Sequence, residues 1–279
     1  SRLVIVLFSQ GTAAATRPLA RQLERLGLCL SPRCVRLRGP LGQRPPGGRQ
    51  KPCFLEVFSG CGRLTDAVRA CGWDVLPPMD VKSGQWADLT RRQVVEAVLS
   101  LIRSGKVQWV HFGPPCKTFS SWYVQFAKLA SRSRRRPLGS GRNPAELLGN
   151  QLAFVTAEIV AACRDHGVWW TVEQPRASLM WDIPCFKKLL RYADTNSAYL
   201  VYCRFGEEYQ KRTRFAGNMP RLCSLSCKCS RDHVHVRLEG TVAGPDGRRM
   251  NRTELAASYP LALCAALASV ADKAWQDGL

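Results

Sequence analysis

From residue 53 onward, short apolar runs alternate with longer amphipathic stretches, and this alternation constrains the fold more than any other feature. The apolar runs cover residues 53–60, 73–81, 107–113 and 168–175, and the stretches with helical spacing cover 62–71, 90–105 and 143–167. Strands separated by helices of this length form parallel sheets that are covered on both faces. The sequence therefore predicts a doubly wound α/β domain.

Changes in composition divide the chain into four segments. Residues 1–52 hold a strand-like run (LVIVLF), an amphipathic stretch and a Gly/Pro/Arg-rich sequence typical of a flexible linker. We expect the α/β core at residues 53–215 and a small Cys/His-containing appendage at 216–250. Residues 251–279 should form a helix that returns to the core.

The charge of the chain indicates a polyanionic partner. Lys and Arg number 41 against 21 Asp and Glu, which gives a formal net charge of +20. Such an excess most simply predicts binding to nucleic acid, and the alternative is a solvated basic surface without such a partner. No apolar run approaches the length of a membrane span, so we expect no membrane partner.

The cysteines indicate a reducing compartment. The chain has 13 of them, an odd number at irregular spacings, which argues against a disulfide framework. We interpret most of them as reduced, buried thiols of an intracellular protein, nuclear if the source is a eukaryote.

The segment EVFSGCGRL, residues 56–64, has the composition of a ligand-binding turn. Ligands of open parallel sheets bind where strands end, above all after the first strand. Gly60 and Gly62 let the backbone pass close to a ligand, and Asp80 and Asp88 are candidates to accept hydrogen bonds from ribose hydroxyls. The alternatives are a tight turn without a ligand and ordinary helix caps. A nucleoside without a pyrophosphate would not need the third glycine of a dinucleotide fingerprint.

Cys116 is the candidate nucleophile, with a structural thiol as the alternative. Pro114 and Pro115 fix two φ angles directly before it, which limits the movement of its sulfur. A cysteine reacts as the thiolate, so an acid and a cation are expected nearby. Glu173 ends a later strand, just ahead of Pro175, and should lie at the same edge of the sheet.

The cation has two candidates. Arg212 and Arg214 alternate along an extended segment and should point the same way.

Four of these blocks resemble motifs of the cytosine-C5 DNA methyltransferases. FLEVFSGCGRL resembles the first S-adenosylmethionine motif, GPPCKTFS the Pro-Cys nucleophile loop, VEQP the Glu-Asn-Val/Pro motif and QKRTR the Gln-x-Arg-x-Arg motif. Order and spacing agree with the family from Phe54 to Phe215. The resemblance implies a Rossmann-like, S-adenosylmethionine-dependent methyltransferase sheet. It also implies methyl transfer to carbon 5 of a cytosine that is flipped out of DNA.

The resemblance assigns roles to individual residues. Cys116 would add to carbon 6 of cytosine, Glu173 would protonate or hydrogen-bond N3, and Arg214 would hold O2, with Arg212 supporting the loop. The implied cofactor-pocket residues are Phe58, Ser59, Gly60, Cys61, Gly62, Asp80, Val81, Asp88 and Pro114. Ser120 and Gln210 would contact nucleic acid.

The basic run at residues 129–144 follows the nucleophile loop. In the family this segment is mobile and closes on the nucleic acid, so phosphate contacts are expected from Arg132, Arg134, Arg135, Arg136 and Arg142. The alternative is a solvated surface loop.

The chain departs from the family pattern at several positions. Glu56 replaces the usual Asp, Arg63 replaces a glycine, and Gln174 replaces the common Asn. The last family motif keeps Pro260 and its apolar helix but lacks the Gly-Asn pair, which weakens the inference of tight cofactor binding.

The segment that would read the target sequence is short and rich in metal-binding residue types. Short segments of this kind are similar to those of compact phage and mobile-element methyltransferases. It carries Cys223, Cys227, Cys229, His233 and His235. We predict one zinc ion bound by Cys223, Cys229 and His235, with Cys227 or His233 as the fourth ligand. The alternative is a hairpin with ordinary thiols and exposed imidazoles.

Three functions fit these patterns. The first is an active DNA cytosine-C5 methyltransferase. The second is a catalytically impaired relative that persists as a nucleic-acid-binding module, and the third is an RNA cytosine-C5 methyltransferase.

Overall fold

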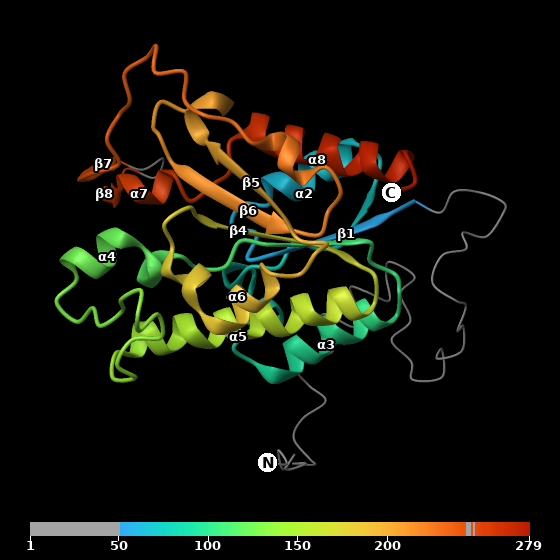
Figure 1. Ribbon diagram of the computed structural model, residues 1–279, viewed down its shortest axis with the longest axis horizontal. Helices are drawn as coiled ribbons and strands as arrows, with labels where there is room; N and C mark the ends of the chain where they lie inside the picture. The colour runs from blue at the N-terminus through green and yellow to red at the C-terminus, as the bar shows by residue number, and fades with distance from the viewer. Residues whose placement is uncertain (1–50, 244–246, 248) are drawn as a thin grey trace.

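The computed structural model describes residues 51–243, 247 and 249–279, so the predictions for residues 1–50 lie outside the described part. It contains a six-stranded sheet of order β2-β1-β3-β4-β6-β5 (Figure 1). The strands are β1 (Cys53–Val57), β2 (Asp74–Val75), β3 (Trp109–Phe112), β4 (Trp169–Pro175), β5 (Asn196–Val201) and β6 (Arg212–Gly217). The first four run parallel, whereas β6 is antiparallel to both β4 and β5. The predicted α/β fold is confirmed, with one inserted antiparallel strand that the sequence did not indicate.

Helices cover both faces of this sheet, as Figure 1 shows. One face carries α2 (Arg63–Ala70) and α8 (Leu261–Gln276), and we call it the α2/α8 face. The other, the α5 face, carries α3 (Arg92–Arg103), α5 (Pro144–Asp165) and α6 (Pro184–Leu189). Successive strand residues point to opposite faces, so Phe54 packs in the α2/α8 cluster and Leu55 in the other.

The long helix α5 begins at a capping residue and a proline, and its composition is strongly apolar. Asn143 accepts a hydrogen bond from the Ala145 N–H (3.0 Å), and Pro144 occupies the first turn, where a missing N–H costs nothing. Contrary to the expectation of no span-length apolar segment, α5 is long and apolar enough to cross a membrane by length and composition alone. Half of its most apolar window is buried inside the protein.

The strand order places a switch point at the carboxyl edge of the sheet. β2 and β3 pair with opposite sides of β1, so the chain reverses its direction of travel across the sheet between them. Ligands of such sheets bind at the carboxyl ends of the strands that flank this switch point. The segments that leave there are the glycine turn after β1 and the Cys116 loop after β3, which continues into α4 (Ser121–Phe126).

The C-terminal part returns to the core earlier than predicted. β6 extends to Gly217, and Met219, Leu222 and Leu225 are buried in the α2/α8 cluster, so the core continues past residue 216. A two-stranded ribbon, β7 (Thr241–Ala243) and β8 (Arg249–Asn251), then leads into α7 (Arg252–Leu255). These elements lie at the same end of the molecule as α4 (Figure 1).

Candidate active site

The turn after β1 has a left-handed conformation and is held by the segment that follows β2. Phe58, Gly60 and Gly62 have φ angles of 58°, 58° and 72°. The Gly60 N–H donates to Asp80 Oδ2 at 2.9 Å, and the Lys82 N–H donates to Asp80 Oδ1 at 3.0 Å. Asp80 thus shapes the turn itself, which leaves its remaining lone pairs for a ligand. An added Cβ at Gly60 would meet nothing within 4 Å, so the turn is open toward solvent there.

The other candidates around this turn differ in their surroundings. Asp88 accepts hydrogen bonds from the N–H and the hydroxyl of Thr90 at 3.0 and 2.7 Å, which is the local role given above as its alternative. Val81 is 65% exposed, and Cys61 is also exposed.

A C-terminal segment lies against the turn where the family pattern was weakest. Arg63 donates to the carbonyl of Tyr259 at 2.9 Å, and Cys61 Sγ lies 3.5 Å from Ser258 Oγ. At Gly113 an added Cβ would come within 2.6 Å of the Tyr259 hydroxyl, so only glycine fits there without displacing the ring. Arg63, in place of a glycine, thus anchors the segment that precedes α8.

Buried polar groups lie beneath the turn on the α2/α8 face. Glu56 Oε2 accepts hydrogen bonds from the N–H and hydroxyl of Thr65 at 2.8 and 2.5 Å, and Oε1 has no partner. Burial raises the pKa of Glu56 to about 7, because the charged carboxylate is desolvated. His111 bonds Thr171 Oγ1 at 2.8 Å and the Tyr259 hydroxyl at 2.9 Å. Burial lowers the pKa of His111 to about 3.

Gln174 holds the nucleophile loop in place. Its Nε2 donates to the carbonyl of the buried Pro114 at 2.5 Å, and its Oε1 accepts from Ser178 Oγ at 2.9 Å. The longer side chain, in place of the family's Asn, therefore joins the loop after β3 to the end of β4.

Cys116 is half-buried, and the charges of Glu173 and Lys211 act on its thiol. Burial raises the pKa of its thiol, the positive charge of Lys211 lowers it, and the carboxylate of Glu173 raises it. Lys211 Nζ is 3.4 Å from Glu173 Oε1, 3.3 Å from the Tyr202 hydroxyl and 3.1 Å from the carbonyl of Ala256. The printed contact is the ion pair of Glu173 with Lys211, and the charges of both residues act on the Cys116 thiol. Sequence reasoning missed Lys211.

The arginine pair projects to the opposite face of the sheet from Glu173. Glu173 pairs across the sheet with Phe215, and Gln174 pairs with Arg214. Because directly paired residues share a face, Glu173 projects to the α2/α8 face and Arg214 to the α5 face.

The guanidinium of Arg214 has partners of its own. It bonds Ser197 Oγ at 2.9 Å and lies 4.8 Å from the Trp181 ring and 5.3 Å from the Tyr199 ring. Burial lowers its pKa. Arg212, two residues earlier on the same side of β6, is exposed.

The basic loop contains one buried arginine, so the prediction that Arg132 contacts phosphates is wrong. Arg132 is 3% exposed, and its guanidinium stacks 3.8 Å from the Phe119 ring centroid. It donates to Asn150 Oδ1, Thr118 Oγ1 and the carbonyls of Pro137 and Glu146. The packing of α5 against the loop creates this pocket, which composition does not reveal.

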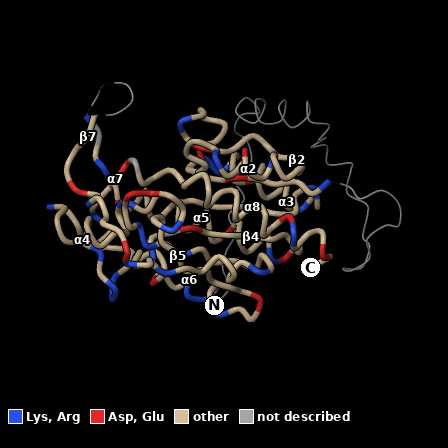
Figure 2. Tube along the Cα trace, turned by 90° about the horizontal axis from the view of Figure 1, so that it is seen from above, with Lys and Arg blue, Asp and Glu red and all other residues tan. Residues whose placement is uncertain are grey.

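The remaining basic residues of the loop are free to face solvent. Arg134, Arg135, Arg136 and Arg142 are all exposed. Figure 2 shows basic stretches of chain around α4. Ser120 caps α4, since its hydroxyl accepts from the Tyr123 N–H at 3.1 Å, and Gln210 lies beside residues 235–239 in a shallow surface pocket.

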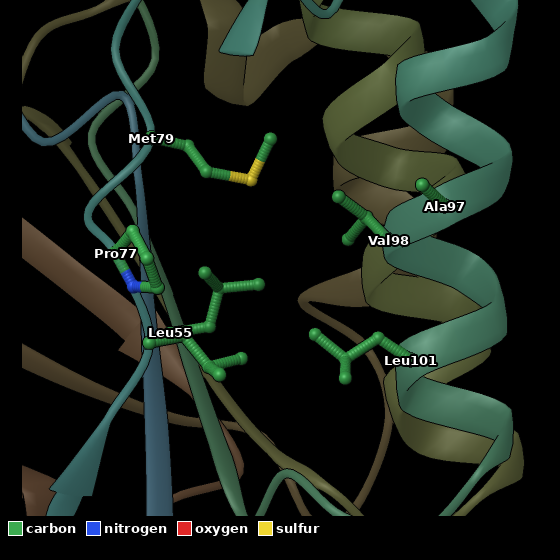
Figure 3. Close-up of a pocket in the computed structure, with 7 residues that line it drawn as sticks. Leu55, Pro77, Met79, Ala97, Val98 and Leu101 are labelled. Carbon is green, nitrogen blue, oxygen red and sulfur yellow. The ribbon is translucent and has the colours of Figure 1, made fainter. Parts of the chain in front are cut away.

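An apolar gap between β1 and α3 is unrelated to this site. Leu55, Pro77 and Met79 face Ala97, Val98 and Leu101 across it, as Figure 3 shows. Its lining carries no hydrogen-bonding side chain, so it lacks the polar groups that orient a nucleoside.

The Cys/His segment forms a cluster with a different membership from the predicted one. Cys229, His233 and His235 meet Cys203, which comes from the turn directly after β5. Cys223 is exposed on a 3-10 turn and Cys227 packs against the apolar core, and neither belongs to the group. Cys203 was missed because it lies outside the Cys/His-rich segment of the sequence.

Comparisons with known proteins give only distant similarity. No protein-family model and no curated protein matches the chain. Two similar solved structures are the Dnmt2 methyltransferase of S. pombe and the methyltransferase EhMeth of Entamoeba histolytica. They are 11% and 12% identical with TM-scores of 0.38 and 0.38, and they cover 68% and 69% of this chain. The chain spans 58% and 59% of their lengths, so a function must come from the site itself.

Proposed function

We propose that this chain transfers a methyl group from S-adenosylmethionine to carbon 5 of cytosine in DNA. The observation that carries the proposal is the ion pair of Glu173 with Lys211, whose charges act on the Cys116 thiol, in a loop that leaves the same edge of the sheet as the open glycine turn. A thiol, an acid and a cation are the groups that nucleophilic addition to a pyrimidine needs. The motif resemblance of the sequence supports the same reaction.

The residues around the glycine turn fit a nucleoside-bearing cofactor. The turn is open at Gly60, and a half-buried carboxylate, Asp80, stands at the end of the neighbouring segment. Phe58, Ser59, Val81 and Pro114 are the other residues that would hold the cofactor, whose sulfonium supplies the methyl group. Asp88 contributes indirectly, because its carboxylate shapes the turn before α3.

The chain's own groups divide the remaining work. The thiolate of Cys116 adds to carbon 6, while Glu173 donates a proton or hydrogen bond to N3, which takes up the electron density. Lys211 stabilises both the thiolate and the carboxylate by charge. After the methyl group is attached, carbon 5 loses its proton to a base or water, and the bond from sulfur to carbon 6 breaks.

The charge of the surface supports nucleic acid as the substrate. We propose that the enzyme acts inside the cell, and in the nucleus if the source is a eukaryote. The exposed Arg134, Arg135, Arg136 and Arg142 lie in the loop that follows Cys116, where phosphates would approach. Tritiated S-adenosylmethionine with matched DNA and RNA duplexes decides between substrates. We expect label in DNA cytosine and covalent trapping by 5-fluorocytosine DNA, and label only in RNA would assign the RNA reaction instead.

One observation favours a catalytically impaired module as the second candidate. Arg214, to which the family resemblance gives the O2 contact, is engaged by Ser197 and by aromatic rings on the other face of the sheet. Calorimetry with S-adenosylmethionine separates the two: heat of binding supports the enzyme, whereas DNA binding without cofactor binding supports the module.

A further inference from the structure

The Cys/His cluster has the dimensions of a tetrahedral metal site. The ligand atoms of Cys203, Cys229, His233 and His235 all lie within 4.8 Å of one another. Cys229 Sγ is 3.5 Å from His235 Nε2 and 3.9 Å from His233 Nε2. A tetrahedral zinc with ordinary Zn–S and Zn–N bonds places sulfur and nitrogen about 3.5 Å apart. The donors are thus preorganised around a common centre.

Groups outside the cluster orient these donors. His233 Nδ1 lies 2.7 Å from Asp232 Oδ1, so Nε2 is the nitrogen left for a metal. A carboxylate on the second nitrogen is the usual support of a metal-binding histidine. The Arg231 N–H donates to Cys229 Sγ at 3.3 Å, in a turn where Arg231 has a φ of 65°. An amide N–H that donates to sulfur stabilises the thiolate, which is the form that binds metal.

The segment that carries three of these residues has little other reason to be ordered. Val234 is 95% exposed, and the Val236 N–H donates to the carbonyl of the exposed loop residue Glu208 at 2.8 Å, so core contact comes from the flanking Cys227 and Leu238. Small units with little apolar burial need a metal or disulfides to fold. Every described cysteine is a free thiol.

We propose that Cys203, Cys229, His233 and His235 bind one structural zinc ion. Two thiolates and two neutral imidazoles fill the four coordination positions of the zinc ion, and the two thiolates balance its charge of about +2. No coordination position is therefore left for a reactive water. The ion joins residues 229–235 to the turn after β5, where Tyr202 contacts Lys211. The site holds the segment next to Gln210, and it does not depend on the methyl-transfer proposal.

Metal analysis of the full chain, purified without chelator and dialysed against zinc, tests the proposal. We expect about one zinc per chain, as a closed structural site requires. Cys203→Ser and Cys229→Ser should each lower zinc affinity at least about tenfold, since even outer-shell changes cost that much. Cys223→Ser is the matched control, because this exposed thiol lies outside the cluster, and it should keep the zinc.

Two further readouts guard against misfolding as the cause of zinc loss. Cobalt-loaded wild type should show thiolate-to-cobalt charge-transfer absorption, which Cys203→Ser reduces and Cys223→Ser preserves. Far-UV circular dichroism should show that Cys203→Ser keeps the secondary structure of the α/β core. Limited proteolysis should show that residues 227–239 become sensitive to protease in this variant. Two results would overturn the proposal. One is a wild-type protein that holds no zinc after dialysis. The other is a Cys203→Ser protein that binds zinc normally while Cys223→Ser does not.

Discussion

The two faces of the sheet both bury charged groups at the carboxyl edge, and they do so in different ways. On the α2/α8 face, Glu173 pairs with Lys211 beside the Cys116 thiol. On the α5 face, Arg214 and Arg132 stack on aromatic rings and donate to neutral oxygens. In the first arrangement an ion pair acts by charge on the candidate nucleophile. In the second, each guanidinium packs against an aromatic ring and its hydrogen bonds hold it in place. Under the proposed function, charge on the first face serves the chemistry, whereas charge on the second face supports the structure.

This difference leads us to propose Lys211, and not Arg212 or Arg214, as the cation that acts on the thiol. Arg212 and Arg214 share a side of β6, while Lys211, Thr213 and Phe215 alternate onto the other. Because β6 pairs with β4 so that Phe215 lies opposite Glu173, Lys211 is the residue that reaches the acid.

The largest expected effect is the loss of methyl transfer in Cys116→Ser. Serine is a far weaker nucleophile than a thiolate at neutral pH, so incorporation of label should fall to background while cofactor binding persists. The matched control is Cys185→Ser, which removes a half-buried thiol from α6 on the other face. Equal losses in both variants would place the chemistry elsewhere.

A comparison of Lys211→Met with Arg214→Met tests the assignment of faces most directly. Removal of one preorganised charge that stabilises the reacting groups costs on the order of 100-fold in kcat, so Lys211→Met should lose about that much. Its activity profile should also move to higher pH, because the lysine lowers the pKa of the Cys116 thiol. Arg214→Met should keep most of its kcat. The reverse order in single-turnover assays would return the catalytic role to the arginine.

The buried carboxyl on the α2/α8 face should give stability a specific dependence on pH. The pKa of Glu56 is raised to about 7 in the fold from an ordinary value of 4.5. The folded state therefore binds the Glu56 proton more tightly than the unfolded state does. As a result, the free energy of unfolding of the wild type falls as pH rises from 4.5 to 7. The Glu56→Gln variant has no carboxyl to titrate. Its free energy of unfolding relative to wild type should therefore increase by roughly 3 kcal/mol across that window.

Urea unfolding at pH 4.5 and pH 7.5 measures this difference. Glu96→Gln is the control, because Glu96 is exposed on α3, pairs with Arg103 at the surface and is not among the charges that act on Glu56. A stability difference between wild type and Glu56→Gln that stays constant with pH would show that the carboxyl titrates normally.

The smallest expected effect separates two arginines of one loop. Arg132→Met should destabilise the fold by about 2 kcal/mol, because Asn150 and the carbonyl of Glu146 lose a charged donor in a buried site. Arg135→Met, at an exposed position, should change stability by less than about 0.5 kcal/mol. Thermal unfolding measures both, and comparable shifts would mean that the buried pocket around Arg132 does not form in solution.

Local patterns of the sequence determined the fold class and much of the candidate site. The alternation of apolar runs with helical stretches gave strands that end at Val57, Phe112 and Pro175, within a few residues of the predicted runs. Because parallel strands share a carboxyl edge, that pattern also indicated that the glycine turn, Cys116 and Glu173 would lie near one another. These inferences need only the local periodicity of apolar residues and the rule that ligands of parallel sheets bind at the carboxyl ends of the strands.

Tertiary structure alone decided which side chains complete the site. Alternation along β6 shows that Arg212 and Arg214 share a side, but the face they occupy depends on how β6 inserts between β4 and β5. The meeting of Cys203 with Cys229 depends likewise on the path of the chain after β5, and the burial of Arg132 depends on α5 packing over its loop. In each case the deciding contact joins residues that are distant in sequence, and the free energy of such contacts comes from pairing and packing that no local window contains.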